Sequence, residues 1–168
     1  MCDDRITPTL EDVLAAVIGG AEACGLPGWC RVGIVGGSAA WDTCCDCANG
    51  SGQLWVRLIS WDIDPDFEQP GARGCDQSTR LVIGIGSLRC VPTLDDQGEP
   101  PDPEDEQAAA SLIHWDADVI RNIIMCNLEE RFWQGWIALD WQGGCGGGEH
   151  IFSIPFYPCD CSHSDESE

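Results

Sequence analysis

The chain has 168 residues, with 29 acidic residues against 8 arginines and no lysine, so its formal net charge is −21. Nucleic acids and anionic membranes are negatively charged, so this balance disfavours tight binding to either of them. The hydrophobic fraction of 43% excludes a disordered chain. No run reaches the roughly 18 apolar residues that are needed to span a bilayer.

A single domain is expected over residues 9–158, because a chain of this length suits one domain with a real core. Residues 1–8 form a short polar arm, and residues 159–168 form an acidic C-terminal tail. The acidic N-terminus lacks the character of a signal peptide. We therefore expect folding in a cytoplasm, where structural disulfides are rare.

The first third of the chain predicts a helix followed by two strands. Thr9 and Asp12 have the spacing of a capping box, and apolar residues then recur at helical spacing up to Ala21. The Gly-Leu-Pro-Gly run at 25–28 ends this helix. Residues 30–35 are typical of a short strand, and residues 53–62 are typical of a long one.

The strongest strand signal lies at residues 79–91, which are apolar at both alternating sets of positions. A strand that is apolar on both sides lies in the middle of a sheet, with something packed on each face. Gly84 and Gly86 leave room for a close neighbour, such as a helix backbone. Pro92 ends the pairing, because it has no N–H to donate.

The second half of the chain predicts a charged linker, a helix and a hairpin. Prolines and like charges keep residues 93–106 extended. The helix runs from about residue 104 to 130. Its apolar stripe is Leu112, Ile113, Trp115, Val119, Ile120, Ile123, Ile124 and Cys126. Strands at 135–141 and 151–156 then flank a glycine-rich turn at 142–148.

This order of elements predicts an α+β fold. We expect a mostly antiparallel central sheet of about five strands, with two helices packed against it. The sequence contains no internal repeats.

Twelve cysteines are many for a cytoplasmic chain of this size. Cys24, Cys90 and Cys126 fall in apolar periodic segments, and we interpret them as small core residues. Others gather in two loop segments, where thiols and an imidazole could close a tetrahedral zinc site. The candidate ligands are Cys44, Cys47, Cys159, Cys161 and His163. Disulfides formed after release into an oxidising medium, and free reduced thiols, remain the two alternatives.

The sequence argues against an enzyme and implies no other cofactor. His114, His150 and His163 have no patterned carboxylate or serine partner, and we find no nucleophile elbow or phosphate-binding loop. The acidic stretch at 62–68 resembles a calcium loop only superficially, because Phe67 and Arg73 stand where such a loop needs Gly and Glu. A solvated acidic loop is the simpler interpretation.

The order helix, three strands, acidic linker, helix and hairpin, with the segments RLVIGIGSLRCVPTLDD and HWDADVIRNII, resembles a known family. It is similar to the tail-terminator and neck proteins of long-tailed bacteriophages, especially those of actinobacteria. The resemblance implies a homohexameric ring at the head–tail interface of a virion, assembled in the host cytoplasm. Such a ring caps the tail tube, contacts the tube and the head-completion proteins, and lets DNA pass without gripping it.

Three further roles stay open: a head-completion or stopper protein of the same neck, a small zinc-binding interaction domain, and a thiol enzyme of unknown substrate. For the ring, an acidic lumen would repel phosphate. The lumen or interface candidates in the linker are Asp95, Asp96, Glu99, Asp102, Glu104 and Asp105. Four tryptophans are candidate interface anchors, although a core role suits most of them: Trp55, Trp61, Trp133 and Trp136.

Overall fold

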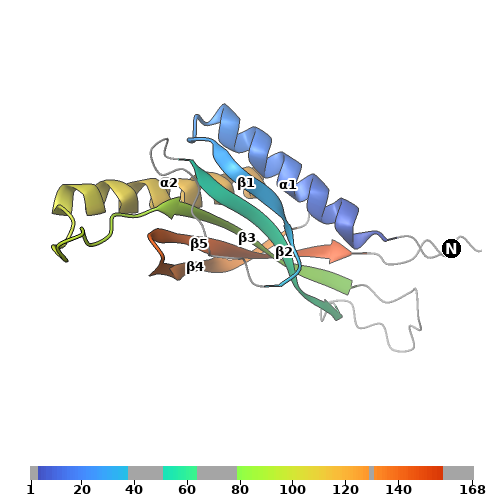
Figure 1. Ribbon diagram of the computed structural model, residues 1–168. Coiled ribbons are helices and arrows are strands. Elements are labelled where there is room, and N and C mark those ends of the chain that lie inside the picture. The colour runs from blue at the N-terminus through green and yellow to red at the C-terminus, as the bar shows by residue number, and fades with distance from the viewer. Residues whose placement is uncertain (1–3, 38–50, 64–78, 129–130, 157–168) are drawn as a thin grey trace, which may run out of the picture.

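The computed structural model describes residues 4–37, 51–63, 79–128 and 131–156 (Figure 1). The elements in chain order are α1 (Ile6–Ala23), β1 (Trp29–Val35), β2 (Gly52–Ile63), β3 (Thr79–Cys90), α2 (Pro103–Asn127), β4 (Phe132–Gln142) and β5 (Cys145–Phe156). The five strands form one sheet in the order β1-β2-β3-β5-β4. Only β1 and β2 pair in parallel, so the predicted α+β fold with a mostly antiparallel sheet is confirmed.

Both helices cover the same face of the sheet (Figure 1). α1 packs on β1 and β2, α2 packs on β3 and β5, and the helices also contact each other. The main core lies between the two layers, and its buried residues are Leu10, Val13, Val17, Leu54, Val56, Leu81, Ile83, Ile85, Ile120, Ile124, Phe152, Ile154 and Phe156. We call the other side of the sheet, away from the helices, the open face.

β3 is the central strand, as its sequence predicts: it pairs with β5 along its whole length and with β2 from Thr79 to Leu88. Leu81, Ile83 and Ile85 belong to the main core and are fully buried beneath the helices. The expectation of a close helix at Gly84 and Gly86 is wrong. Instead, the side chains of Glu149 and Trp55 occupy the space that a Cβ atom would take at these two positions.

The first helix begins three residues earlier than its predicted capping box. Asp4 Oδ1 accepts hydrogen bonds from the backbone N–H groups of Ile6 and Thr7, which are open donors of the first turn. Thr9 lies inside the helix, and its hydroxyl donates to the Arg5 carbonyl. The carboxylate of Asp4 therefore caps the first turn of the helix, a role that the sequence pattern assigned to Thr9.

The second helix buries five of the eight residues of the predicted stripe, and it also buries Asp116. Its buried side chains are Ile113, Asp116, Val119, Ile120, Ile123 and Ile124, whereas Trp115 is 44% exposed and Cys126 is exposed. Asp116 is buried within this face, where its carboxylate pairs with Arg89 of β3. The apolar spacing could not predict that a charged residue lies within the buried face.

The glycine-rich segment is mostly strand rather than turn, contrary to expectation. Only Gly143 and Gly144 form the turn, both with positive φ, and β5 already begins at Cys145. A Cβ atom on Gly147 would overlap the carbonyl of Ser87, and one on Gly148 would overlap the indole of Trp136. The glycines here allow close packing between strands instead of providing flexibility.

Candidate functional site

The open face carries a charged cluster made from two strands that are not neighbours. β3 lies between β2 and β5, and its Gly84 and Gly86 have no side chains to separate the strands on either side. The indole of Trp55 on β2 lies over Gly86, and the carboxylate of Glu149 on β5 lies over Gly84. Residues from β2 and β5 therefore meet directly above β3.

Glu149 is the centre of this cluster. One carboxylate oxygen accepts hydrogen bonds from Trp55 Nε1 at 2.9 Å and from Arg57 Nε at 2.7 Å, and the other accepts from Arg57 Nη2 at 2.6 Å. Glu149 and Trp55 are each only 4% exposed. The hydrogen bond to Glu149 raises the pKa of Arg57 above its usual value. This fork-like pairing fixes the half-buried guanidinium on the face, where Glu149, the buried partner, accepts from two of its nitrogens.

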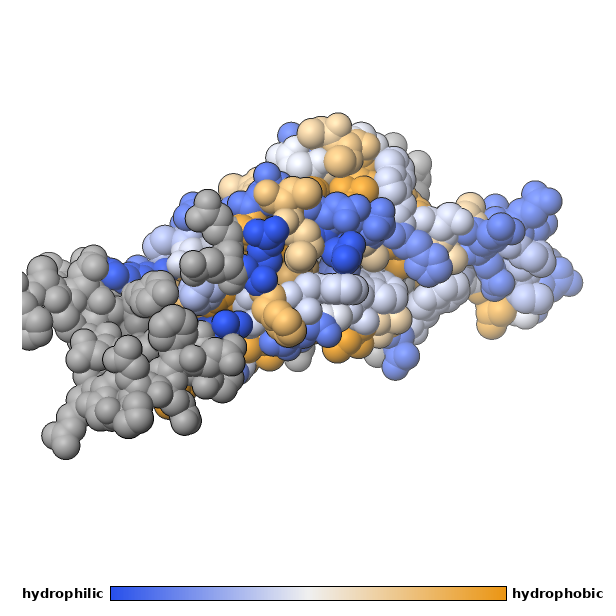
Figure 2. Space-filling model, turned by 180° about the vertical axis from the view of Figure 1, so that it is seen from behind, coloured by the Kyte–Doolittle hydropathy of each residue, from blue (hydrophilic) through white to orange (hydrophobic). Residues whose placement is uncertain are grey.

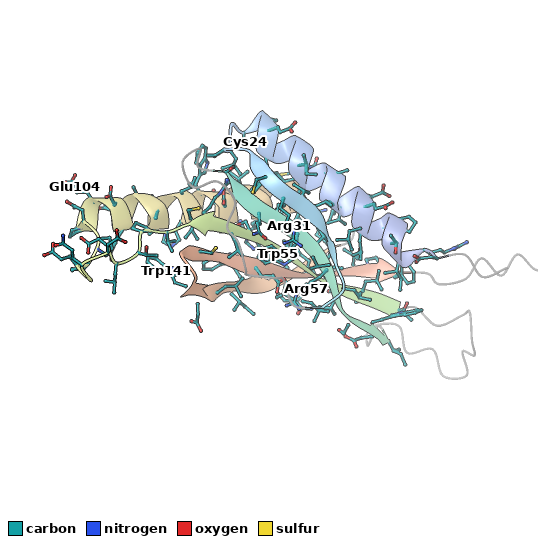
Figure 3. All side chains as sticks on the ribbon, viewed as in Figure 1. Cys24, Arg31, Trp55, Arg57, Glu104 and Trp141 are labelled. Atoms are coloured by element: carbon teal, nitrogen blue, oxygen red, sulfur yellow. The ribbon has the colours of Figure 1, made fainter. Side chains whose placement is uncertain are left out.

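The described residues of the open face line two hollows. The first, which we call the Arg80 hollow, has a volume of about 300 Å³ and is lined by Asp62, Ile63, Arg80, Val82, Phe132, Gln134 and Ser153. It combines one arginine and one aspartate with apolar and neutral polar side chains. The second, of about 260 Å³, lies over β1 and the start of β2 and includes Arg31 and Trp55. Figure 3 labels Arg31, Trp55 and Arg57 on these two strands.

The predicted linker, residues 93–106, is an acidic arm with defined structure. It contains a tight turn, in which Asp95 Oδ1 accepts hydrogen bonds from the N–H groups of Gln97 and Glu99, at 2.8 and 2.9 Å. Asp102 caps α2 by accepting from the N–H of Glu104 at 2.9 Å. The expectation of a wholly extended linker is therefore wrong.

All six predicted interface acids are exposed on this arm: Asp95, Asp96, Glu99, Asp102, Glu104 and Asp105. Glu104 stands at the outer end of α2, far from the sheet residues labelled in Figure 3. In Figure 2 the same end of the molecule is a hydrophilic projection from the body. The structure thus brings these acids together, on one end of the molecule.

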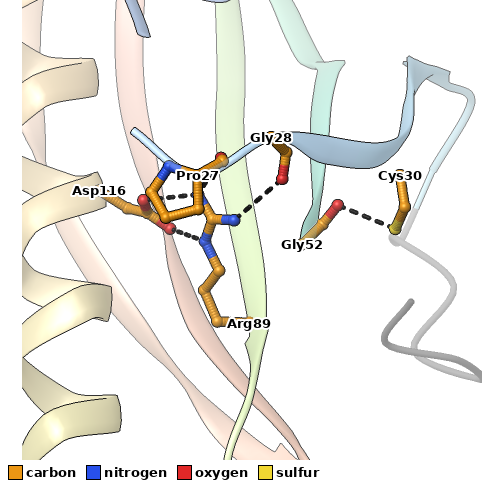
Figure 4. Close-up of polar contacts among 6 residues, drawn as sticks. All are labelled: Pro27, Gly28, Cys30, Gly52, Arg89 and Asp116. Carbon is orange, nitrogen blue, oxygen red and sulfur yellow. Dashed lines mark hydrogen bonds and ion pairs between the residues drawn. The ribbon is translucent and has the colours of Figure 1, made fainter. Parts of the chain in front are cut away.

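A buried ion pair holds α2, and hence the arm, against the sheet (Figure 4). Arg89 Nε and Nη2 donate to the two oxygens of Asp116 at 2.7 and 2.9 Å, and both side chains are almost fully buried. Arg89 also donates to the carbonyls of Pro27 and Gly28 and stacks on Trp29 at 3.9 Å. Burial raises the pKa of Asp116, and its hydrogen bond with Arg89 opposes that shift.

His150 is buried between the sheet and α2, at 2% exposure. Its Nε2 donates to the carbonyl of Ala117 at 2.8 Å, and the rings of Trp133, Trp136 and Phe152 surround it. Among the described residues, Nδ1 has no hydrogen-bond partner. Burial, helped by the positive charge of Arg121, lowers the pKa of His150 to about 4, so the ring is neutral near pH 7.

The predicted zinc ligands Cys44, Cys47, Cys159, Cys161 and His163 all lie outside the described residues. Within the described ranges, no group of three or more ligating side chains is placed to hold a metal ion.

Cys30, Cys90 and Cys145 are disulfide-bonded, and Cys30 Sγ lies 3.1 Å from the Gly52 carbonyl (Figure 4). Cys24 and Cys126 are free and exposed. The expectation of core thiols at Cys24, Cys90 and Cys126 is therefore wrong.

The tryptophans proposed as anchors have different environments. Trp55 is buried in the Glu149 cluster, and Trp133 and Trp136 are half-buried around His150. Trp61, at 49% exposure, contacts Phe156 edge-on. Of the four, Trp61 offers the most surface to a partner.

Sequence reasoning missed the Glu149 cluster, Arg80 and the Arg89–Asp116 pair. One signal was present, because Arg57 and Arg89 interrupt strands that are otherwise apolar. A charge at such a position needs a partner on another element. The identity of that partner depends on strand order, which the sequence alone leaves open.

In the described part of the chain, neither helix is both long and apolar enough to cross a membrane. The chain matches no protein-family model. It also matches no curated protein sequence.

Proposed function

We propose that this protein is a non-catalytic structural subunit of a bacteriophage virion: a tail terminator that forms a ring at the head–tail interface. The observation that carries the proposal is the element order α1-β1-β2-β3-α2-β4-β5 folded as one sheet with both helices on one face. That order is the feature on which the resemblance to tail-terminator and neck proteins rests. The proposal places the protein in the virion, next to the tail tube and the head-completion proteins.

The charge of the chain supports this role. A net charge of −21 gives most of the surface a negative potential, which repels DNA phosphates. A ring around a moving duplex has to avoid gripping it. The exposed acidic arm adds to this effect, since seven acids stand there without a basic residue: Asp95, Asp96, Glu99, Asp102, Glu104, Asp105 and Glu106.

Imaging of the purified full-length chain tests the proposal. We expect ring particles by negative staining and a matching native mass by sedimentation, in low salt. Because some neck proteins assemble only on their tail, the same measurement is repeated with purified phage tail tubes present. Monomers under both conditions would contradict the proposed ring.

DNA retention provides an independent test. The proposal predicts no stable complex with double-stranded DNA at physiological salt, because phosphate repulsion opposes it. A basic DNA-binding protein serves as the positive control in the same gel-shift assay. Tight binding at that salt concentration would contradict a passive channel.

The alternative within the same class is a head-completion or stopper subunit. Both would form rings, so the ring alone does not separate them. Co-sedimentation with isolated tail tubes and with DNA-filled heads does: a terminator binds the tube end, whereas a head-completion protein binds the head.

A further inference from the structure

The sheet ends in two edge strands, β1 and β4, and among the described residues each of them pairs with a strand on one side only (Figure 1). The other side of an edge strand presents backbone N–H and C=O groups that can pair with a strand of another chain. Register shifts interrupt both strands. Between or beyond these shifts, the regular segments are Arg31–Val35 in β1 and Gly135–Leu139 in β4, with five residues in each.

These two regular segments lie at the same level of the sheet. The registers of the four strand pairs connect positions across the sheet row by row. One row runs from β1 to β4 through Gly33, Trp55, Gly86, Glu149 and Ile137. Arg31 and Leu139 are the two ends of a second row. Residues of one row share a face, so Gly33 and Ile137 both belong to the open face.

The directions of the two edge strands also match. β1 and β2 are parallel, whereas the three further pairs across the sheet are antiparallel, so β4 runs opposite to β1. A second copy is placed beside the first by rotation about a ring axis that lies along the strands. Its β1 then lies antiparallel to β4 of the first copy, and the helices of both copies lie on the same side of the sheet.

The side chains of the two edges are complementary in shape. Ile137 is 56% exposed on β4. At the other edge, no described atom lies within 4 Å of the position that a Cβ atom would take on Gly33. Gly33 lines the hollow of about 260 Å³ that includes Arg31 and Trp55, which we call the Arg31 hollow. In the arrangement above, Ile137 of one copy lies opposite Gly33 of the next, where this hollow has room for it.

Charge distinguishes this contact from the pairing of two like edges. Each edge strand contains one charged residue, Arg31 in β1 and Asp140 in β4, and both are exposed. Arg31 makes no hydrogen bond or ion pair with another described residue, and the described lining of its hollow contains no acid. Asp140 directly follows Leu139, so β1 and β4 bring opposite charges to the same end of the junction. Two β1 edges or two β4 edges would bring only like charges.

We propose that β4 of one copy pairs antiparallel with β1 of the next copy, with Gly135–Leu139 opposite Arg31–Val35 and Ile137 seated in the Arg31 hollow. The partner of each edge is thus a second copy of this chain, added as a strand. Two different surfaces meet, so the contact is head-to-tail and repeats around a closed ring. This inference rests on the proposed ring and names the interface that builds it.

Hydrogen exchange of the full-length wild type tests the strand pairing directly. Exchange is followed by mass spectrometry in low salt, in the assembled protein and after dilution has dissociated it. We expect amides of residues 29–35 and 132–142 to exchange at least about tenfold more slowly in the assembly, because pairing protects them. Peptides from α1 serve as the internal control and should exchange equally in both samples.

Variants of the full-length chain test the side-chain contacts. Ile137→Lys places a charge opposite the Arg31 hollow and should weaken self-association at least about tenfold, measured by sedimentation velocity. The matched control is Ile63→Lys on the inner strand β2, because Ile63 is 59% exposed, and it should behave as the wild type. Arg31→Glu and Asp140→Arg should each weaken assembly, and the chain that carries both should regain it. Circular dichroism checks folding.

The outcomes separate the edge contact from the ring itself. Rings in which both edge segments exchange as fast as in the dissociated protein would overturn the edge contact and leave the ring intact. Rings formed equally well by Ile137→Lys, or slower exchange of β4 alone, would do the same. A wild-type protein that never assembles would overturn both proposals.

Discussion

Glu149 and Arg57 lie on strands separated by β3, yet the carboxylate of Glu149 accepts two hydrogen bonds from the guanidinium of Arg57, at 2.7 and 2.6 Å. The contact exists because Gly84 leaves the intervening strand without a side chain. It joins β2 to β5 directly, and with Trp55 it fixes the arrangement of the open face.

Replacing Glu149 by Gln removes the charge but keeps the shape of the side chain. Arg57 would keep its contact with the Gly37 carbonyl but lose its charged partner. We expect a loss of about 2 kcal/mol in the free energy of unfolding, measured by urea denaturation. Glu104→Gln, at the exposed end of α2, is the control and should change stability by less than about 0.5 kcal/mol. Equal effects at the two positions would show that the cluster is not stabilising.

Gly86→Ala tests the close approach of Trp55. The new Cβ atom would overlap the indole, so the ring has to shift and strain its hydrogen bond to Glu149. We expect a loss of about 1–3 kcal/mol. Gly33→Ala on β1 faces the same side and has no neighbouring atom within 4 Å of its Cβ position, so it should be nearly neutral. A Gly86→Ala protein as stable as the wild type would argue against the packing described.

Asp116→Asn leaves the guanidinium of Arg89 buried without an opposing charge. We expect a loss of about 3–5 kcal/mol in the free energy of unfolding, because an uncompensated buried charge is costly. The double variant Arg89→Met with Asp116→Leu removes both charges and should lose less than Asp116→Asn alone. If the double variant were the less stable of the two, the cost would lie in lost packing or lost backbone contacts instead.

Protonation of His150 should destabilise the protein in acid. Its pKa is about 4 in the folded state and about 6.5 when unfolded, so the unfolded state binds the proton first as the pH falls. The stability contributed by the neutral ring is complete above about pH 6.5. It is lost progressively toward pH 4, and the total loss is about 3 kcal/mol.

The variant His150→Gln keeps a donor for the Ala117 carbonyl and does not titrate. Urea denaturation from pH 7 to pH 4 should therefore show a smaller fall in stability for this variant than for the wild type. His114→Gln, at an exposed site on α2, is the control and should follow the wild-type curve. Parallel curves for all three proteins would rule out His150 as the titrating group.

Alkylation of the native protein should separate the cysteines by their bonding. We expect a maleimide to label Cys24 and Cys126, which are free and exposed, without a reducing agent. Cys30, Cys90 and Cys145 should be labelled only after reduction and unfolding. Peptide mass spectrometry reads out each site. Labelling of Cys145 in the native, unreduced protein would contradict its disulfide.

The sequence predicts a helix or strand well where a single physical requirement determines it. Residues 79–91 are apolar on both sides, and only the middle of a sheet satisfies such a segment, so β3 is found within one residue. The start of α2 follows from Pro103 and its acidic first turn, which favour a helix N-terminus.

The predictions fail where the deciding partner is distant in sequence. In the sequence, Gly146–Gly148 resemble a flexible turn. In the structure they belong to β5, where Ser87 and Trp136 pack closely against Gly147 and Gly148. Trp115 matches the apolar stripe in the sequence, but α2 buries Asp116 against Arg89, and Trp115 is 44% exposed. The acids of the arm were identified as a surface feature, but the Arg80 hollow is lined by four strands whose order no local pattern gives.

The guanidinium of Arg89 contacts the loop before β1, the strand β3 that carries it, and the helix α2. These three segments come from the beginning, the middle and the later part of the chain. Detaching the edge strand β1 would strip carbonyl partners from a cation that water does not reach. Partial unfolding from this edge is therefore penalised, and we expect the loop before β1 to unfold together with β3 and α2.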